Sequence, residues 1–368
     1  MNKTRLLDRF LRYIACASET GNEKAFCDLM EQELLRIGLH VVRDDVSQKC
    51  GSTGYNIYAS LPGTGAPLLL SAHLDTVSPG KDITPVIENG VIRSAGDTIL
   101  GADDKSGVAA ILEALESVIE QDTPHRPVEV LLSVCEEVGL LGSKYADYSL
   151  IRSKQAIVLD SSKNGCIINR APANTHLHVE IKGKGAHAGI SPDRGIHALK
   201  AAALAVANIP CGFVDDNSVM NVSNFLSPGK TNVVPEHASF DMEIRSFSEE
   251  LLQTHVQNAK DAVKSACEAL GAQYSVTEER HSDVLYVPET SPLFKDLLSV
   301  YEELGVPVKI DRTYGGSDAT WLFYNGIDAL NVGTGMCEAH ALTEHIAIAD
   351  LERTARMVER MITRLSSQ

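Results

Sequence analysis

Several apolar runs in this sequence end in side chains that can bind metal ions. Each run is rich in valine, leucine or isoleucine, and each has a histidine or a carboxylate at or just after its end. The runs and their groups are LLLSAHLDTV (68–77) with His73 and Asp75, VEVLLSVCEEVG (128–139) with Glu136 and Glu137, AIVLDSS (156–162) with Asp160, and DALNVGTG (328–335), followed by CEAHALTEH with His340. Imidazole and carboxylate are the ligands that zinc and related divalent ions take from proteins.

A further pair of carboxylates stands at the start of the segment GADDKSGVAAILEALESVIE (101–120). Its apolar residues recur at helical spacing, which puts Asp103 and Asp104 near a helix N-terminus, where carboxylates are stabilised. Without cations, so many buried anions would raise one another's pKa values until some became neutral. The ligands are too many for one tetrahedral ion, whereas two ions about 3.5–4 Å apart that share a carboxylate would satisfy them. We expect two divalent ions, zinc for preference, with cobalt or manganese as alternatives.

The spacing within the His73–Asp75 and Glu136–Glu137 pairs suggests different roles for the two members of each pair. Residues two apart on a strand face the same side, so the carboxylate of Asp75 is expected to reach the ring of His73 and orient it. The neighbours Glu136 and Glu137 cannot both face one metal from a regular strand, so one is expected to be a ligand and the other a general base. A metal-free hydrolase that uses Asp75 and Glu136 as paired carboxylates is an alternative, and metal analysis would decide it.

The apolar runs also indicate how these side chains come together. Continuous runs of this kind are typical of buried parallel strands. Open sheets of such strands bind ligands at the carboxyl ends of the strands, so the groups should meet at one sheet edge. The runs alternate with helical patterns, and helices are expected over 4–37, 291–304 and 349–365. This alternation predicts an α/β fold with a mostly parallel sheet.

Residues 173–288 have a different pattern. Apolar and polar residues alternate over 176–183 and 237–247, which predicts strands with one solvated face. The segments 195–209 and 251–270 have helical spacing. We therefore expect an α+β domain at 173–288, with an antiparallel sheet and two helices, inserted into a catalytic domain formed by 1–172 and 289–368.

Composition excludes several classes of partner. The net charge is −16, from 33 basic and 49 acidic residues, which argues against a nucleic-acid or anionic-membrane partner. The first twenty residues lack the apolar core of a signal peptide, and no run approaches the roughly 18 apolar residues of a membrane span. The eight cysteines include no C-x-x-C pair, which indicates thiols in a reducing compartment. A cytoplasmic protein is expected.

Taken together, the motifs His-x-Asp, Gly-Ala-Asp-Asp-Lys, Glu-Glu-Val-Gly, Leu-Asp and a late His-x-x-x-Glu resemble the zinc exopeptidase family of peptidase T and carboxypeptidase G. The resemblance covers nearly the whole chain, and five motifs in the right order are a specific signal. It implies one metal held by His73 and Asp160, a second held by Glu137 and His340, and Asp103 bridging both. It also implies Glu136 as the general base and Asp75 as the acid that orients the site.

The same resemblance extends to the inserted domain, which looks like the family's lid and dimerisation domain. GKGAHAGISPDRGIHAL (183–199) matches the segment whose histidine, here His187, would stabilise the oxyanion at the partner subunit's site. GKTNVVP (229–235) supplies Asn232, and FDMEIRSF (240–247) supplies Arg245, which would grip a substrate carboxylate. Gly316 and Ser317 of GGSD would line the substrate pocket. A homodimer formed through this domain is implied.

Within the family, aspartate at position 160 and the wording GADDK and EEVGLLG are similar to peptidase T and its shorter relatives. The expected function is hydrolysis of short peptides by an aminopeptidase of the tripeptidase type. The chain departs from the family at CEAH, where a segment rich in glycine or asparagine is usual. The alternatives are an N-acyl amino acid deacylase or carboxypeptidase of the same family and, from another class, a non-catalytic metal-dependent binding protein.

Overall fold

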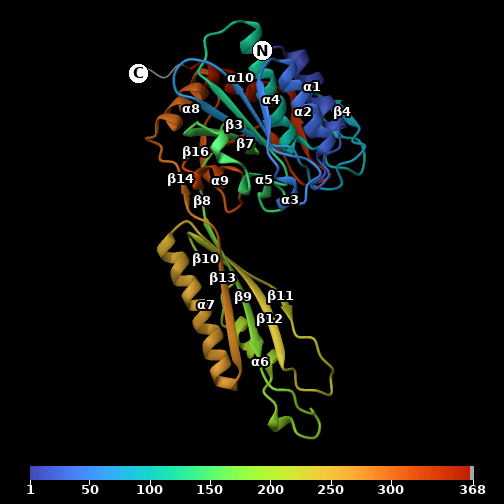
Figure 1. The fold of residues 1–368 in the computed structure, drawn as a ribbon, viewed down its shortest axis with the longest axis vertical. Helices are drawn as coiled ribbons and strands as arrows, with labels where there is room; N and C mark the ends of the chain where they lie inside the picture. The colour runs from blue at the N-terminus through green and yellow to red at the C-terminus, as the bar shows by residue number, and fades with distance from the viewer. Residues whose placement is uncertain (365–368) are drawn as a thin grey trace. The chain divides into compact units, whose positions relative to one another are not determined.

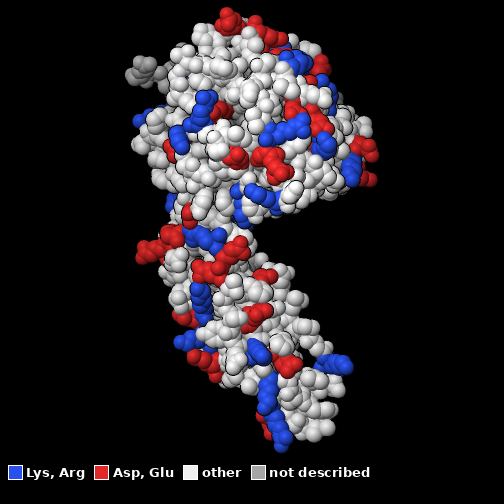
Figure 2. Space-filling model, in the orientation of Figure 1, with Lys and Arg blue, Asp and Glu red and all other residues white. Residues whose placement is uncertain are grey.

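The computed structural model describes residues 1–364 as two compact units. Unit 1 consists of Met1–Asn169 and the segment from Tyr286 onward, and unit 2 is Arg170–Leu285 (Figure 1). The boundaries expected from the sequence were 173 and 288. Acidic and basic side chains are interspersed on the visible face of both units (Figure 2). No helix among the described residues is long and apolar enough to cross a membrane.

Unit 1 is built on a nine-stranded sheet with the order β1-β2-β6-β3-β7-β16-β8-β14, to which β15 is added by pairing with β8. The neighbours β6, β3, β7 and β16 are all parallel, and the pairs β1–β2, β2–β6 and β16–β8 are antiparallel. The strands are β1 (His40–Arg43), β2 (Ile57–Leu61), β3 (Leu68–His73), β6 (Val128–Ser133), β7 (Gln155–Ser161), β8 (Cys166–Ala171), β14 (Leu285–Tyr286), β15 (Lys309–Arg312) and β16 (Asp328–Gly333). The four parallel strands are the four apolar runs, which confirms the predicted mixed α/β fold.

Helix α4 is the central helix of unit 1, because it packs on β3 and β7 and also contacts α1 and α10. The helices of this unit are α1 (Lys3–Ala15), α2 (Lys24–Arg36), α3 (Ser47–Cys50), α4 (Ala102–Glu120), α5 (Leu141–Lys144), α8 (Pro292–Glu303), α9 (Ala319–Tyr324), α10 (Ile348–Thr363) and the short 3₁₀ helix η1 (Tyr148–Leu150). Residue 365, the last of the helix expected over 349–365, lies outside the described residues.

The single helix expected over 4–37 is wrong, because the chain leaves the helix between α1 and α2. There it runs beside the segment that follows β3: Thr76 N–H donates to Ser18 O and Thr20 N–H donates to Thr76 O, both at 3.0 Å. Gly21 then takes a φ of 88°, a left-handed conformation that glycine adopts without strain. Each helix has its own buried apolar residues, and the hydrogen bonds that end α1 come from a segment more than 50 residues away along the chain, so helical spacing alone did not indicate the break.

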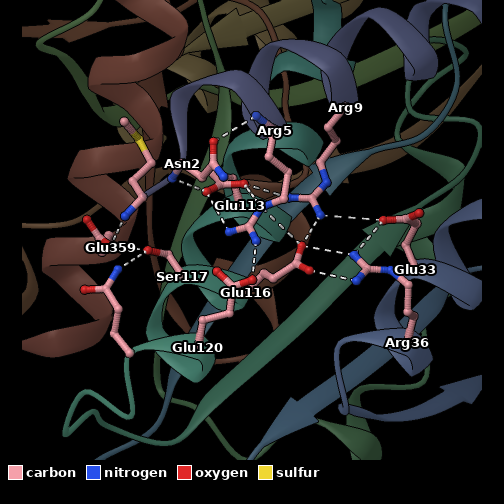
Figure 3. A network of polar contacts seen from close by, with 12 residues as sticks. Asn2, Arg5, Arg9, Glu33, Arg36, Glu113, Glu116, Ser117, Glu120 and Glu359 are labelled. Atoms are coloured by element: carbon pink, nitrogen blue, oxygen red, sulfur yellow. Dashed lines mark hydrogen bonds and ion pairs between the residues drawn. The ribbon is translucent and has the colours of Figure 1, made fainter.

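Arginines of α1 and α2 pair with glutamates of α4 in one network (Figure 3). The carboxylate of Glu113 is fully buried and accepts from Arg5 at 2.7 and 2.9 Å and from Arg9 at 3.1 Å. One turn further along α4, Glu116 pairs with Arg9 and accepts from Arg36 at 2.7 and 3.0 Å. The network therefore fixes the two N-terminal helices against the helix that begins with the Asp-Asp pair.

A small antiparallel sheet of unit 1 holds the segment that contains His340. Its order is β17-β18-β5-β4, formed by β4 (Pro85–Glu88), β5 (Val91–Ser94), β17 (Met336–Cys337) and β18 (His345–Ala347). Because His340 lies in the connection between β17 and β18, the pairing of β18 with β5 anchors this connection. We call residues 338–344 the His340 loop.

Unit 2 is an antiparallel sheet in the order β10-β11-β12-β9-β13. Its elements are β9 (Ala173–Lys182), η2 (Pro192–Arg194), α6 (Ala198–Ala207), β10 (Gly212–Asp215), β11 (Ser218–Leu226), β12 (His237–Ser246), α7 (Glu249–Leu270) and β13 (Gln273–Ser282). Both helices pack on β9 and β12, and the alternate residues Leu177, Val179 and Ile181 of β9 lie in the core beneath them. The two strands and two helices predicted for this segment are confirmed.

Candidate metal centre

The five predicted ligands meet at the carboxyl-terminal edge of the parallel strands. His73 is the last residue of β3, Asp160 lies near the end of β7, and Glu137 follows β6. Asp103 lies in the first turn of α4, and His340 is in its own loop. Strand order β6-β3-β7 makes three of these segments immediate neighbours, as the rule for parallel sheets predicts.

The carboxylate of Asp103 contacts both histidines, each through a different oxygen. Its Oδ1 lies 3.0 Å from His73 Nε2, and its Oδ2 lies 3.1 Å from His340 Nε2. His73 Nε2 is also 4.0 Å from Asp160 Oδ1, and His340 Nε2 is 2.9 Å from Glu137 Oε1. Asp103 thus stands between two clusters, one with His73 and Asp160 and the other with Glu137 and His340.

The donor atoms of these clusters fit divalent cations. In each of the two clusters, one ligand atom from every member lies within 4.8 Å of the others. A third such group is formed by His73, Glu136 and Glu137. Glu137 Oε1 is buried and accepts no hydrogen bond, although it lies close to His340 Nε2. A buried carboxylate oxygen with no donor is costly, and coordination to a cation would satisfy it.

The electrostatics of the pocket agree with this fit. Burial, and then the charge of Asp160, raise the pKa of Glu136 well above its usual range. Burial, and then the charge of Asp103, do the same to the pKa of Asp160. For Asp103 itself, burial acts to raise the pKa, but hydrogen bonds from His340 and His73 outweigh it and lower the pKa. The pocket therefore holds more negative charge than the protein alone stabilises.

Asp75 contacts the ring of His73 with two groups. His73 Nδ1 lies 2.9 Å from the backbone oxygen of Asp75 and 3.5 Å from its carboxylate, so the predicted approach of the carboxylate to the ring is present as the longer of the two contacts. Because β3 ends at His73, strand alternation does not continue to residue 75. The Asp75 carboxylate also accepts the backbone N–H groups of Glu136 at 2.9 Å and Glu137 at 3.2 Å. It fixes the turn that holds both glutamates.

Asp104 accepts hydrogen bonds from two backbone N–H groups. Its Oδ2 accepts the backbone N–H of His73 at 3.3 Å, and its Oδ1 accepts that of Gly107 at 3.2 Å. The peptide bond between Asp103 and Asp104 is cis. The two neighbouring aspartates make different contacts: Asp103 contacts the two histidines, and Asp104 joins the end of β3 to the start of α4.

The sequence did not predict a role for two buried carboxylates at this edge. Asp318, only 1% exposed, follows Gly316 and Ser317 before α9 and accepts a hydrogen bond from Ser133 at the end of β6. Glu344, also 1% exposed, accepts backbone N–H groups of the segment that leads into α4. Asp318 belongs to the motif GGSD and Glu344 to the motif His-x-x-x-Glu. Their hydrogen-bond partners are distant in sequence, so no local pattern could indicate that these carboxylates are buried.

Gly316 and Ser317 lie in unit 1, and the predicted residues His187, Asn232 and Arg245 lie in unit 2. His187 pairs with Val233 in an isolated bridge, and the backbone oxygen of Asn232 accepts the N–H of Ala188 at 2.9 Å, so the loops 183–197 and 227–235 are joined. Arg245 lies on β12 and donates to Glu243 at 2.6 Å. Unit 2 thus brings His187 and Asn232 together and holds Arg245 on its sheet.

Unit 1 gathers two histidines and several carboxylates at the ends of its parallel strands, and unit 2 is an antiparallel α+β unit. This combination identifies the class of the protein as a metallohydrolase. Residues 69–364 match Peptidase family M20/M25/M40, and the chain belongs to this family as a peptidase T-like metallopeptidase.

Three relatives illustrate the likeness over the full length. Uncharacterized protein YqjE of Bacillus subtilis is 33% identical over 365 residues, which cover 98% of each chain. The crystal structure of aminopeptidase PepT from Bacillus cereus is 32% identical with a TM-score of 0.92, covering 99% of this chain and 98% of the other. That of a tripeptidase from Staphylococcus aureus is 30% identical with a TM-score of 0.93 and the same coverage.

Proposed function

We propose that this peptidase is a two-metal aminopeptidase that removes the N-terminal residue of short unblocked peptides, tripeptides above all. The observation that carries the proposal is the position of Asp103, whose two carboxylate oxygens each face a different histidine. A carboxylate placed in this way is suited to bridging two cations. The aminopeptidase and tripeptidase activities named for two of the solved structures support this choice of substrate.

In this proposal His73 and Asp160 would hold one ion, Glu137 and His340 would hold the other, and Asp103 would contact both. Mixed nitrogen and oxygen ligation favours zinc, with cobalt or manganese as substitutes. When bound, such a pair would supply Lewis-acid chemistry, lowering the pKa of the attacking water and polarising the scissile carbonyl. The same proposal places the enzyme in the cytoplasm, where its eight cysteines stay as thiols.

Glu136 is the general base in this scheme. It accepts a proton from the attacking water and then delivers it to the leaving amine. The carboxylate of Asp75 holds the backbone N–H of Glu136, so the base is presented from a fixed turn. Cys135, which directly precedes Glu136, has a positive φ of 52°, so the chain turns between β6 and the base.

Residues of unit 2 complete the proposed site through a homodimer. His187 of one subunit would stabilise the oxyanion formed at the partner's metal centre. Arg245 would bind the substrate's terminal carboxylate and Asn232 would position the substrate, while Gly316 and Ser317 of unit 1 would line the pocket. Support for these parts comes from the motifs that contain the residues and from the joined loops that hold His187.

A panel of blocked and unblocked peptides tests the proposal. It would contain trialanine, N-acetyl-trialanine, trialanine amide, dialanine and N-acetyl-alanine, assayed with zinc, with a chelator and with zinc restored. We expect release of the N-terminal alanine from trialanine, abolished by N-acetylation and by the chelator and recovered with zinc. Turnover of N-acetylated substrates alone would instead identify a deacylase or carboxypeptidase. Binding of trialanine without turnover would identify a binding protein, and chelator-resistant turnover would identify a metal-free hydrolase.

A further inference from the structure

The carboxylate of Glu344 lies beneath the segment that leads into α4. Its Oε2 accepts the backbone N–H groups of Leu100 at 2.8 Å and Gly101 at 2.7 Å, and its Oε1 accepts that of Asp103 at 2.9 Å. Three donors on one buried carboxylate form charge-assisted hydrogen bonds, which are about twice as strong as neutral ones. Both oxygens of Glu344 are therefore committed to the backbone of one short segment.

This segment needs an external acceptor because of its place at the start of a helix. The first N–H groups of a helix have no acceptor within the helix. Gly101 has a left-handed φ of 73°, and Asp103 has non-helical φ and ψ angles of −81° and 106°. The first turn of α4 is thus irregular. Glu344 provides acceptors for N–H groups on both sides of Ala102.

Glu344 also belongs to the His340 loop, directly before β18. Strand β18 is paired with β5, where His345 stands opposite Arg93. The hydrogen bond from Asp103 N to Glu344 therefore joins two segments that are 241 positions apart in the chain. One of these segments contains Asp103, and the other contains His340, whose Nε2 faces Asp103 Oδ2 at 3.1 Å.

We propose that Glu344 is a positioning residue that sets the separation of Asp103 and His340, and through it the affinity of the metal site that they share. The inference rests on the proposed function. Two segments close that site: the irregular first turn of α4, which contains Asp103, and the His340 loop. Among the described residues, Glu344 accepts hydrogen bonds from the backbone of the segment with Asp103 and itself belongs to the His340 loop.

The test is a zinc titration of the full chain by calorimetry after metal removal. Glu344→Gln keeps the size of the side chain and places an amide nitrogen against a backbone N–H. Glu344→Asp keeps the charge but shortens the reach. Glu338→Gln is the matched control, because Glu338 is an exposed glutamate of the same loop. Substitutions of groups that orient metal ligands usually weaken metal binding 10- to 100-fold.

We expect Glu344→Gln to weaken zinc binding at one of two sites by 10- to 100-fold, Glu344→Asp to weaken it less, and Glu338→Gln to change it less than twofold. The urea midpoint of the metal-free protein should fall in both Glu344 variants, because backbone N–H groups lose a buried acceptor, while both remain folded during the titration and Glu338→Gln keeps the wild-type midpoint. Zinc binding within twofold of wild type in Glu344→Gln would overturn the inference while leaving the proposed function intact. Failure of both Glu344 variants to fold would assign the residue to stability alone and would also overturn it. If the wild type binds no zinc, the proposed function falls as well.

Discussion

The Arg–Glu network on α4 makes a quantitative prediction about stability. In Glu113→Gln, Arg9 keeps Glu116 and Arg5 keeps Glu120, so neither guanidinium loses its last carboxylate. Removing one partner of a buried ion pair usually costs 3–5 kcal/mol, and these remaining partners place the expected loss near the lower end, about 3 kcal/mol. The matched control is Glu120→Gln, on the same helix, because Glu120 is 54% exposed and has Arg5 as its partner. Exposed pairs contribute about 0–1 kcal/mol.

Urea denaturation of the metal-free variants measures both losses. The single tryptophan of the chain, Trp321, lies half-buried in α9, so its fluorescence reports on the unfolding of unit 1. With an m value of about 3 kcal/mol/M, a loss of 3 kcal/mol lowers the midpoint by about 1 M. Equal midpoints for Glu113→Gln and Glu120→Gln would show that burial does not decide the strength of these pairs.

Three further predictions concern acid stability and the site. Burial acts to raise the pKa of Glu116, but hydrogen bonds from Arg36 and Arg9 lower it to about 2, against about 4.3 when unfolded. The stability that this lowered pKa provides is present above about pH 4.3 and is lost as the pH falls towards 2. The urea midpoint should therefore drop less between pH 5 and pH 3 in Glu116→Gln than in the wild type. An equal drop in the two proteins would contradict this prediction. Glu136→Gln should lower kcat on trialanine 10²- to 10⁴-fold while zinc content measured by mass spectrometry is retained; a kcat within tenfold of wild type would exclude Glu136 as the base. Mixing inactive Glu136→Gln with inactive His187→Ala should restore activity through heterodimers that contain one complete site, and no recovery after verified subunit exchange would show that His187 does not act across subunits.

The sequence predicted the sheet edge well because its signal was local. A run of Val, Leu and Ile indicates a buried strand, and the residue that ends the run lies at the carboxyl end of that strand, as His73, Glu136 and Asp160 do. Once the runs were taken as neighbouring parallel strands, the proximity of their terminal groups followed from the topology. The structure adds the separate contacts of Asp103 with the two histidines, which strand periodicity alone could not provide.

What the sequence could not predict depends on contacts between distant segments. The break between α1 and α2 arises from hydrogen bonds to Thr76, and the hydrogen bonds of Glu344 reach the start of α4. Glu113 looks like an ordinary charged residue of an amphipathic helix, and its complete burial is visible only once α1 packs on α4. Similarly, the contacts of the Asp75 carboxylate with the backbone of Glu136 and Glu137 depend on where β3 ends, and element boundaries are the least reliable part of a prediction from sequence.

Five side chains of unit 1 are proposed to hold a pair of cations. Anomalous scattering from crystals of the zinc-loaded protein would locate these cations. We predict two peaks about 3.5–4 Å apart, the first bound by His73 and Asp160, the second by Glu137 and His340, with Asp103 in contact with both. A single peak, or peaks that Asp103 does not contact, would contradict the account.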